Sequence, residues 1–425
     1  MLSHATTYLG GRDTVDETYL LPSEEPSMTA VPSLLVSGYT EAGSGTGPGI
    51  ARYELLADGV VGERQAEAVA VTNPSFMARS VMTHSVVDQS VVDHGKGMVI
   101  SVEELPHGNV VALDMQTLEV LGRASSGGAD SCHVAIVDDA AWVANYSSGT
   151  AAVVPLAGLL DGTAAKVPEL LSHPGSGPVS GRQGESHAHQ VTATAWGTVL
   201  VSDLGADRVD EYSASSRVRI VSAELPPGTG PRHVALRGDY LLVAGELDGH
   251  LHVLQRALLA RSGDASVPTA GDAPVPTAEQ GEDGHSWRWL FRVPLAESAA
   301  EIAASAEFFP SHIELSADGK LLYAAVRGPN TIVVLDVTGL PANPDIRSIA
   351  RPPEFLRQVS SGGRWPRHFA VVRAGQGNHK LYVANQHSDQ LAVFVLDERG
   401  LPEASPVQMV NFASPACVVP VMPIL

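Results

Sequence analysis

A short apolar motif that recurs seven times along the chain limits the possible folds more than any other feature. Each copy has apolar residues ending in Ser or Ala, is bounded by Gly, Asp or Asn, and is typical of a buried β-strand. The copies lie at 34–37, 98–101, 141–144, 199–202, 241–244, 322–325 and 381–384. A short turn and a second strand-like segment follow each copy, as in NVVALDM (109–115). Repetition of one strand-rich unit indicates a repeat architecture.

A second recurring segment precedes six of the seven copies. Its examples are NPSFMA (73–78), DSCHVA (130–135), SHAHQV (186–191), GPRHVA (230–235), FPSHIE (309–314) and WPRHFA (365–370). A seventh example, SPACVV (414–419), lies at the C-terminus, and the copy at 34–37 is the partner that it lacks. The sequence therefore predicts an all-β fold, a seven-bladed β-propeller of four-stranded blades. The ring closes by pairing N- and C-terminal strands in one blade. Two irregular β-sandwiches, the alternative, would not explain the complementary ends.

The repeats absorb most of the 425 residues, so we expect one propeller over residues 31–425. Residues 1–30 are expected to form a flexible N-terminal tail. Residues 257–287 are rich in Ala, Pro, Gly and Asp, which predicts a surface insertion in the fifth blade, between its third and fourth strands. A shorter loop is expected at 157–185.

Charge and composition exclude several classes of partner. The chain has 27 basic and 47 acidic residues, a net charge of −20, which argues against nucleic acid or an anionic membrane as the partner. No run of 18 apolar residues predicts a membrane span, and the first residues lack the pattern of a signal peptide. Only two cysteines occur, so no disulfide framework is expected. We expect a cytoplasmic protein, either a monomer or a small homo-oligomer.

Polar residues recur at two positions that a propeller brings together. The first strand of each blade lines the central channel and the second runs antiparallel to it, so the start of one and the end of the other share a face. At the start of the first strands the aligned polar residues are His133, His189, His233, His312 and His368, with Arg232 and Arg367 one position earlier. At the end of the second strands they are Glu103, Tyr146, Glu246, Arg327 and Gln386. A charged cluster in a concave mouth predicts an active site.

The weight of these residues differs. Structural hydrogen bonding between blades is the alternative role for His133, His233, His312 and His368. In contrast, His187 and His189 project from one strand at period two, so at least one of them is expected to face the site. Arg232 and Arg327 would be costly to bury unpaired. If Glu246 pairs with one of them, the other is free to bind an anionic ligand.

No cofactor or metal is expected. His187, His189 and Asp203 could begin a metal site, but no further ligand spacing supports one. The Gly-rich segment 43–49 lacks the Lys-Ser/Thr pair of a phosphate-binding loop.

Several motifs, in this order and spacing, resemble those of the seven-bladed lactonase family. They are NPSFMA, ANYSSGT (144–150), SHAHQV, DLGADRV (203–209), GPRHVAL (230–236), GEL (245–247), LSADGKLLYAAVRG (315–328) and ANQHSDQLAVFVLD (384–397). That family includes the propeller-type 6-phosphogluconolactonase and the carboxy-cis,cis-muconate cyclase. The proposed active-site groups of the cyclase are a histidine, two arginines and a glutamate. The resemblance matches them to His187 or His189, to Arg232 and Arg327, and to Glu246.

These observations lead to one preferred function and two alternatives. The preferred function is a metal-independent lactonase acting on a sugar-acid lactone such as 6-phosphogluconolactone, with a small anionic lactone or carboxylate as substrate. The catalytic candidates are His187, His189, Arg232, Glu246 and Arg327. The substrate-binding candidates are Glu103, His133, Tyr146, His233, His312, Arg367, His368 and Gln386. The alternatives are a lactonizing cycloisomerase of the carboxy-muconate type, which would use the same residues, and a noncatalytic propeller that binds partners.

Overall fold

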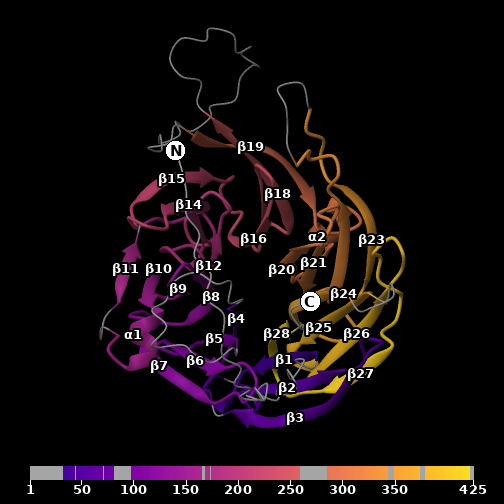
Figure 1. Ribbon diagram of the computed structural model, residues 1–425. Helices are drawn as coiled ribbons and strands as arrows, with labels where there is room; N and C mark the ends of the chain where they lie inside the picture. The colour runs from indigo at the N-terminus through magenta and orange to yellow at the C-terminus, as the bar shows by residue number, and fades with distance from the viewer. Residues whose placement is uncertain are drawn as a thin grey trace, which may run out of the picture.

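The strands of this protein form a ring of seven blades. The computed structural model describes residues 32–43, 45–69, 71–80, 97–164, 168–172, 174–258, 285–342, 349–373 and 379–421. They form seven four-stranded sheets arranged around a central axis (Figure 1). The predicted seven-bladed β-propeller is thus confirmed. The tail predicted at 1–30 and most of the insertion predicted at 257–287 lie outside the described residues.

In each blade the first strand lies nearest the axis and the fourth at the rim (Figure 1). From the axis outwards, the first three blades contain β4 (Met77–Arg79), β5 (Met98–Glu103), β6 (Asn109–Asp114) and β7 (Val120–Ser125); β8 (Ser131–Val137), β9 (Ala140–Asn145), β10 (Thr150–Pro155) and β11 (Glu169–Ser172); and β12 (Ala188–Ala193), β13 (Thr198–Asp203), β14 (Arg208–Ser213) and β15 (Arg219–Glu224). The next three contain β16 (Pro231–Arg237), β17 (Tyr240–Gly245), β18 (His250–Leu258) and β19 (His285–Pro294); β20 (Phe309–Leu315), β21 (Leu321–Arg327), β22 (Thr331–Asp336) and β23 (Glu354–Ser360); and β24 (Pro366–Arg373), β25 (His379–Asn385), β26 (Gln390–Leu396) and β27 (Gln408–Asn411).

The seventh blade joins the two ends of the described chain. It contains β28 (Pro415–Val421), β1 (Ser33–Gly38), β2 (Ile50–Leu55) and β3 (Val61–Val69), in that order from the axis. β28 pairs antiparallel with β1, and Leu35 lies opposite Val419. The predicted closure between N- and C-terminal strands is confirmed.

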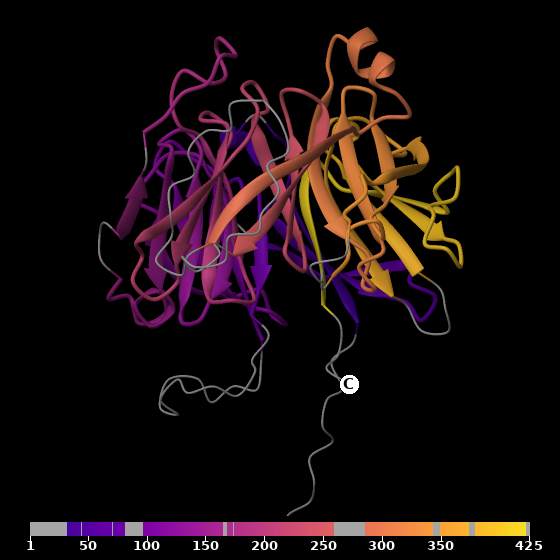
Figure 2. The same ribbon diagram turned by 90° about the horizontal axis from the view of Figure 1, so that it is seen from above.

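Short helical segments lie in the connections. They are α1 (Leu156–Asp161), α2 (Ala299–Ala304) and the 3₁₀ turns η1 (Glu41–Gly43) and η3 (Gln386–Ser388). Seen edge-on, the ring is a thick disc, and α2 projects beyond one face (Figure 2). Two predicted loop boundaries were wrong. The segment 157–185 contains most of α1 and the whole of β11, because each blade takes its fourth strand from such a connection. Residues 257–258 and 285–287 belong to β18 and β19.

The hydrophobic core consists of layers between neighbouring blades. In one layer Leu242 and Val253 of one blade pack with Leu322 and Val333 of the next. The second strands, such as β9, β13 and β17, are buried along their whole length. They face a neighbouring blade on both sides, which explains why the recurring sequence motif is continuously apolar and does not alternate.

The innermost strands are irregular where they reach one mouth of the channel. In five blades the pairing between the first and second strands shifts register there: at 131–133, 188–190, 231–234, 310–313 and 366–368. A bulge of this kind inserts an unpaired residue and re-aims side chains. It allows the neighbours Arg232 and His233 both to be buried near the axis.

Below these bulges five aromatic rings form a closed circle across the channel, which we call the histidine belt: Phe76, His133, His233, His312 and His368. Neighbouring ring centroids lie 3.8 to 5.4 Å apart around the circle. Nδ1 of His233 and Nδ1 of His312 are 2.8 Å apart, so one donates a hydrogen bond to the other. Burial lowers the pKa of all four histidines, for His368 to about 3, so they are neutral. Their assignment as substrate-binding residues stays a prediction.

A carboxyl group lies next to the histidine belt. Glu314 on β20 accepts a hydrogen bond from the backbone N–H of Val371, and its Oε2 is 4.0 Å from Nε2 of His312. Burial raises the pKa of Glu314 to about 8, although the hydrogen bond from Val371 opposes the shift. The carboxyl group is therefore mostly protonated at neutral pH.

We expect Glu314→Gln to stabilise the protein in alkaline solution. Between the ordinary pKa of 4.5 and about 8 the folded state binds more protons than the unfolded state, so stability falls as the pH rises. At pH 9 the variant should gain about 1–2 kcal/mol in free energy of unfolding, a value discounted for the partial exposure of the side chain. The gain should vanish near pH 4.5. Urea unfolding at both pH values measures this, with Glu398→Gln on the surface as control; an equal gain at both would contradict the assignment.

Candidate active site at the channel mouth

The carboxylate of Glu246, which follows β17, holds three arginines at the mouth of the channel. Nη2 of Arg327 lies 2.9 Å from its Oε2, and Nη1 of Arg232 contacts the same oxygen. Nη2 of Arg182 lies 2.5 Å from Oε1. We call these four residues the arginine cluster. Arg232, Glu246 and Arg327 are each at most 5 % exposed, so three side chains that the sequence predicted to converge do so.

Two of these guanidinium groups are fixed by further contacts. Nε of Arg232 donates to the carbonyl oxygen of Ser311 at 3.0 Å, and its Nη1 lies 2.7 Å from Nε2 of His189. Nε of Arg327 donates to the carbonyl of Phe309 at 3.2 Å, and the guanidinium lies over the ring of Trp365. Donors held this firmly need little reorganisation when a ligand arrives.

The electrostatics of the cluster leave an excess of positive charge. Burial alone would raise the pKa of Glu246, but Arg327 and Arg232 outweigh it and hold that pKa well below its usual range. Burial and repulsion from Arg232 lower the pKa of Arg327 to about 9, so it remains charged at neutral pH. Three guanidinium groups against one carboxylate favour the binding of an anion.

The two histidines of the SHAH segment have different surroundings. His189 is buried, its pKa is lowered by burial and by Arg232, and its Nε2 accepts the hydrogen bond from that arginine. His187 is half-buried and stacks on the ring of Tyr146, with centroids 4.5 Å apart. Its Nδ1 lies 3.1 Å from the carbonyl oxygen of Tyr146. A carbonyl only accepts, so Nδ1 carries the proton and Nε2 keeps a lone pair. Within the described ranges no hydrogen bond uses that Nε2.

A second group of polar residues lies across the mouth. The hydroxyl of Tyr39 donates to Oε2 of Glu104 at 2.8 Å, and the guanidinium of Arg367 lies 4.8 Å from the centre of the Tyr39 ring. Nη1 of Arg367 also donates to Oε1 of Gln386 at 3.4 Å. Interactions with Tyr39, Glu104 and Glu246 raise the pKa of Arg367 although its burial opposes them, so its charge is secure.

The prediction of Glu103 as a binding residue was wrong by one position. Its carboxylate accepts hydrogen bonds from the N–H of Thr72, from Asn109 and from Arg123, so it is used within its own blade. At the mouth, the residue after the second strand donates its N–H to the chain leading into the first strand, and this holds for Tyr39, Glu104, Tyr146, Glu246 and Gln386. Successive strand residues point to opposite faces, so Glu104 takes the expected place.

Sequence reasoning also missed Arg182, Tyr39 and Trp365. Tyr39 ends a second strand, in the same column as Tyr146 and Glu246, and that column could have identified it. Arg182 lies between β11 and β12, outside every repeated position, so no periodic signal marked it. Cys132 and Cys417 are free and buried, and burial raises the pKa of the Cys132 thiol, which disfavours a thiolate nucleophile.

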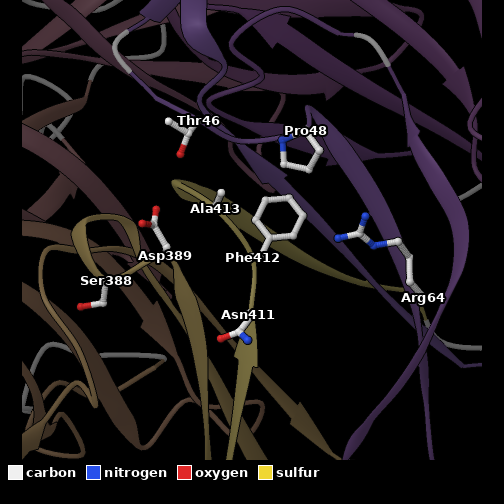
Figure 3. Close-up of a pocket in the computed structure, with 8 residues that line it drawn as sticks. All are labelled: Thr46, Pro48, Arg64, Ser388, Asp389, Asn411, Phe412 and Ala413. Atoms are coloured by element: carbon white, nitrogen blue, oxygen red, sulfur yellow. The ribbon is translucent and has the colours of Figure 1, made fainter.

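The structure also contains an open surface pocket of about 470 Å³ beside the seventh blade (Figure 3). It is lined by Thr46, Pro48, Arg64, Ser388, Asp389, Asn411, Phe412 and Ala413. None of these residues belongs to the arginine cluster, so the pocket is separate from it. Across the described ranges no group of three or more His, Cys, Asp or Glu side chains could hold a metal ion. In the same part of the chain no helix is long and apolar enough to cross a membrane.

Comparison with known proteins agrees with the geometry. The family model described as "Lactonase, 7-bladed beta-propeller" matches residues 33–420, so the chain belongs to this family. The 6-phosphogluconolactonase of Bacillus subtilis is 27 % identical over 391 residues, 90 % of this chain and 96 % of that protein. The 6-phosphogluconolactonase of Formosa agariphila is 25 % identical over 397 residues, 89 % of this chain and 96 % of that protein.

A solved structure gives the same result. The periplasmic gluconolactonase of Pseudomonas aeruginosa superposes with a TM-score of 0.71 at 25 % identity, covering 93 % of this chain and 100 % of that one. Membership of the family supports a lactonase activity for this protein. The expected cytoplasmic location stays a prediction.

We expect Glu246→Gln to lower the free energy of unfolding by about 3–5 kcal/mol at pH 7, because it leaves three arginines without their counter-charge. The folded pKa of Glu246 lies below the ordinary value of 4.5, so its contribution is complete above pH 4.5 and is lost as the pH falls below it. The difference from the wild type should therefore shrink in acid. Urea unfolding at pH 7 and pH 3.5 measures it, with the exposed Glu297→Gln as control. An unchanged stability at pH 7 would contradict the pairing.

Proposed function

We propose that this protein hydrolyses an anionic sugar-acid lactone such as 6-phosphogluconolactone. The observation that carries the proposal is the charge balance at the channel mouth. Four arginines face two carboxylates there: Arg182, Arg232, Arg327 and Arg367 against Glu104 and Glu246. A dianionic phosphate monoester would neutralise the excess of two positive charges. The names of the Bacillus and Formosa relatives support the same class of substrate.

Arg232 and Arg327 are suited to bind the reacting carbonyl group. Each has its Nε bonded to a backbone carbonyl, and both contact one oxygen of Glu246. This arrangement directs their remaining N–H groups into one small volume. An oxyanion that develops there would be stabilised by two positive donors already in position.

His187 is the preferred general base of the two kinds that the sequence left open. The carboxylate of Glu246 is a weak base because its pKa is held low, and the Nε2 of His189 is occupied by Arg232. His187 alone among the three has a lone pair without a protein partner in the described chain. Tyr146 links it to the arginine cluster, because the Tyr146 ring stacks on His187 and its hydroxyl bonds to Arg182.

The proposed reaction needs no covalent intermediate. A water molecule adds to the lactone carbonyl while its proton passes to Nε2 of His187, and the carbonyl oxygen becomes an oxyanion held by the two arginines. When the intermediate collapses, the ring C–O bond breaks and the ring oxygen takes the proton from His187. The product is a hydroxy acid, which releases one proton to solvent as it ionises.

We expect the wild-type protein to hydrolyse 6-phosphogluconolactone, measured in a pH-stat by base uptake. Arg327→Met should lower kcat by about 10²–10³-fold through loss of an oxyanion donor. His187→Gln should lower it by about 10²–10⁴-fold through loss of the base. His379→Gln, at the opposite end of β25 from Gln386, serves as the control and should retain activity.

A parallel ultraviolet assay on carboxy-muconate tests the cyclase alternative. Turnover of the muconate without lactone hydrolysis would replace the proposed reaction by cyclisation. No turnover in either assay would leave the noncatalytic alternative. Full lactonase activity in His187→Gln would refute the choice of base.

A further inference from the structure

Arg182 differs from the other arginines of the cluster in exposure. Its side chain is 36 % exposed, whereas those of Arg232 and Arg327 are 7 % and 6 % exposed. It contacts Oε1 of Glu246, and the two buried arginines contact Oε2. Arg182 therefore lies at the solvent side of the cluster, where an entering ligand meets it first.

The contacts of Arg182 can be exchanged for a ligand at little cost. Ion pairs that reach solvent contribute little stability, whereas breaking a buried pair leaves an uncompensated charge. Arg182 can release Oε1 of Glu246 while Arg232 and Arg327 keep Oε2. Its guanidinium then has free N–H groups, and the adjacent Tyr146 hydroxyl, which now accepts from Arg182, can donate its own hydrogen.

The backbone that carries Arg182 is fixed, so this side chain is a built part of the mouth. The next residue, Gln183, is fully buried and donates from Nε2 to Asp207 at 2.7 Å and to the carbonyl of Leu204 at 2.9 Å. Asp207 also accepts from the N–H groups of Gly228 and Gly230, just before β16. One carboxylate thus ties the segment of Arg182 to the strand of Arg232.

The same segment is also docked further along the chain. Glu185 packs so closely on the β13–β14 turn that a Cβ atom on Gly205 would lie 1.8 Å from the Glu185 carbonyl oxygen. Only glycine permits this approach. The position of Arg182 relative to the buried arginines is therefore set by two separate contacts.

We propose that Arg182, with the Tyr146 hydroxyl, forms a rim subsite for the anionic group of the substrate that is remote from the reacting carbonyl. This inference rests on the proposed lactonase function and deepens it: Arg182 determines the preference for phosphorylated over unphosphorylated sugar lactones. The guanidinium fork matches two oxygens of a phosphate monoester. Arg367, across the mouth, is the competing position. Its partners are Gln386 and the ring of Tyr39, and the subsite is assigned to Arg182 because its contacts are the more exposed.

The test compares kcat/KM for 6-phosphogluconolactone and glucono-δ-lactone in the wild type, Arg182→Met, Arg182→Lys and Arg367→Met. The ratio of the two values should fall about ten- to a hundred-fold in Arg182→Met, mainly through KM of the phosphorylated substrate. Arg182→Lys should give an intermediate ratio, because a lysine keeps the charge and loses the fork. Arg288→Met, on the exposed side of β19, should keep the wild-type ratio.

Calorimetric titration with 6-phosphogluconate and gluconate gives a readout that does not depend on turnover. Arg182→Met should weaken binding of the phosphorylated acid far more than that of gluconate. An unchanged ratio in Arg182→Met, an equal loss for both lactones, or a collapse of the ratio in Arg367→Met alone would overturn the inference and leave the proposed function intact. A wild-type protein that hydrolyses neither lactone would instead overturn the proposed function.

Discussion

Everything at the channel mouth depends on the pairing of β28 with β1. Each blade alone is a four-stranded sheet with two apolar faces, and these are covered only when the ring is complete. The C-terminal strand supplies the innermost position of a blade whose other strands begin at Ser33. This contact between distant parts of the sequence closes the hydrophobic layers and defines a single axis. Residues separated by more than a hundred positions, such as Arg232 and Arg367, then share one small volume.

Closure also explains how a strongly acidic protein maintains a positive site. The net charge of −20 is spread over the whole chain, whereas the arginines are collected from separate blades at the axis. Little protein separates these guanidinium groups, and little solvent screens Arg232 and Arg327, so their local field is strong. Glu246 reduces that field without cancelling it. Part of the folding energy of the ring therefore maintains an electrostatic arrangement that favours an anionic guest.

Much of this arrangement could be predicted from the sequence. The blade count, the closing strand pair and the convergence of Arg232, Glu246 and Arg327 follow from repeat alignment, because equivalent positions in equivalent blades meet at the same height. What the alignment could not supply was local. Glu103 and Glu104 are adjacent and chemically identical, and only the register of the strand pair decides which one faces the axis. The bulges at the first strands shift that register in five blades, and no residue type announces them.

Arg182 shows a second limit. It reaches the cluster from a connection that no other blade shares, and its position depends on the buried contacts of Gln183 and Asp207. A pattern based on repeats identifies what the blades have in common, whereas such connections carry what is particular to one protein. The roles of His187 and His189 could not be separated for a similar reason. Their difference lies in which ring nitrogen is already bonded, and this becomes visible only with the neighbouring blades in place.

The histidine belt has a consequence for traffic through the molecule. Five rings in van der Waals contact leave no passage along the axis, so the mouth is a blind chamber and not one end of a tunnel. A ligand that enters must leave by the way it came. Substrate and product therefore compete for one doorway, and a newly formed acid carries an added negative charge into a chamber rich in arginine. Departure of the product, more than bond breaking, is then the step on which the pace of the enzyme depends.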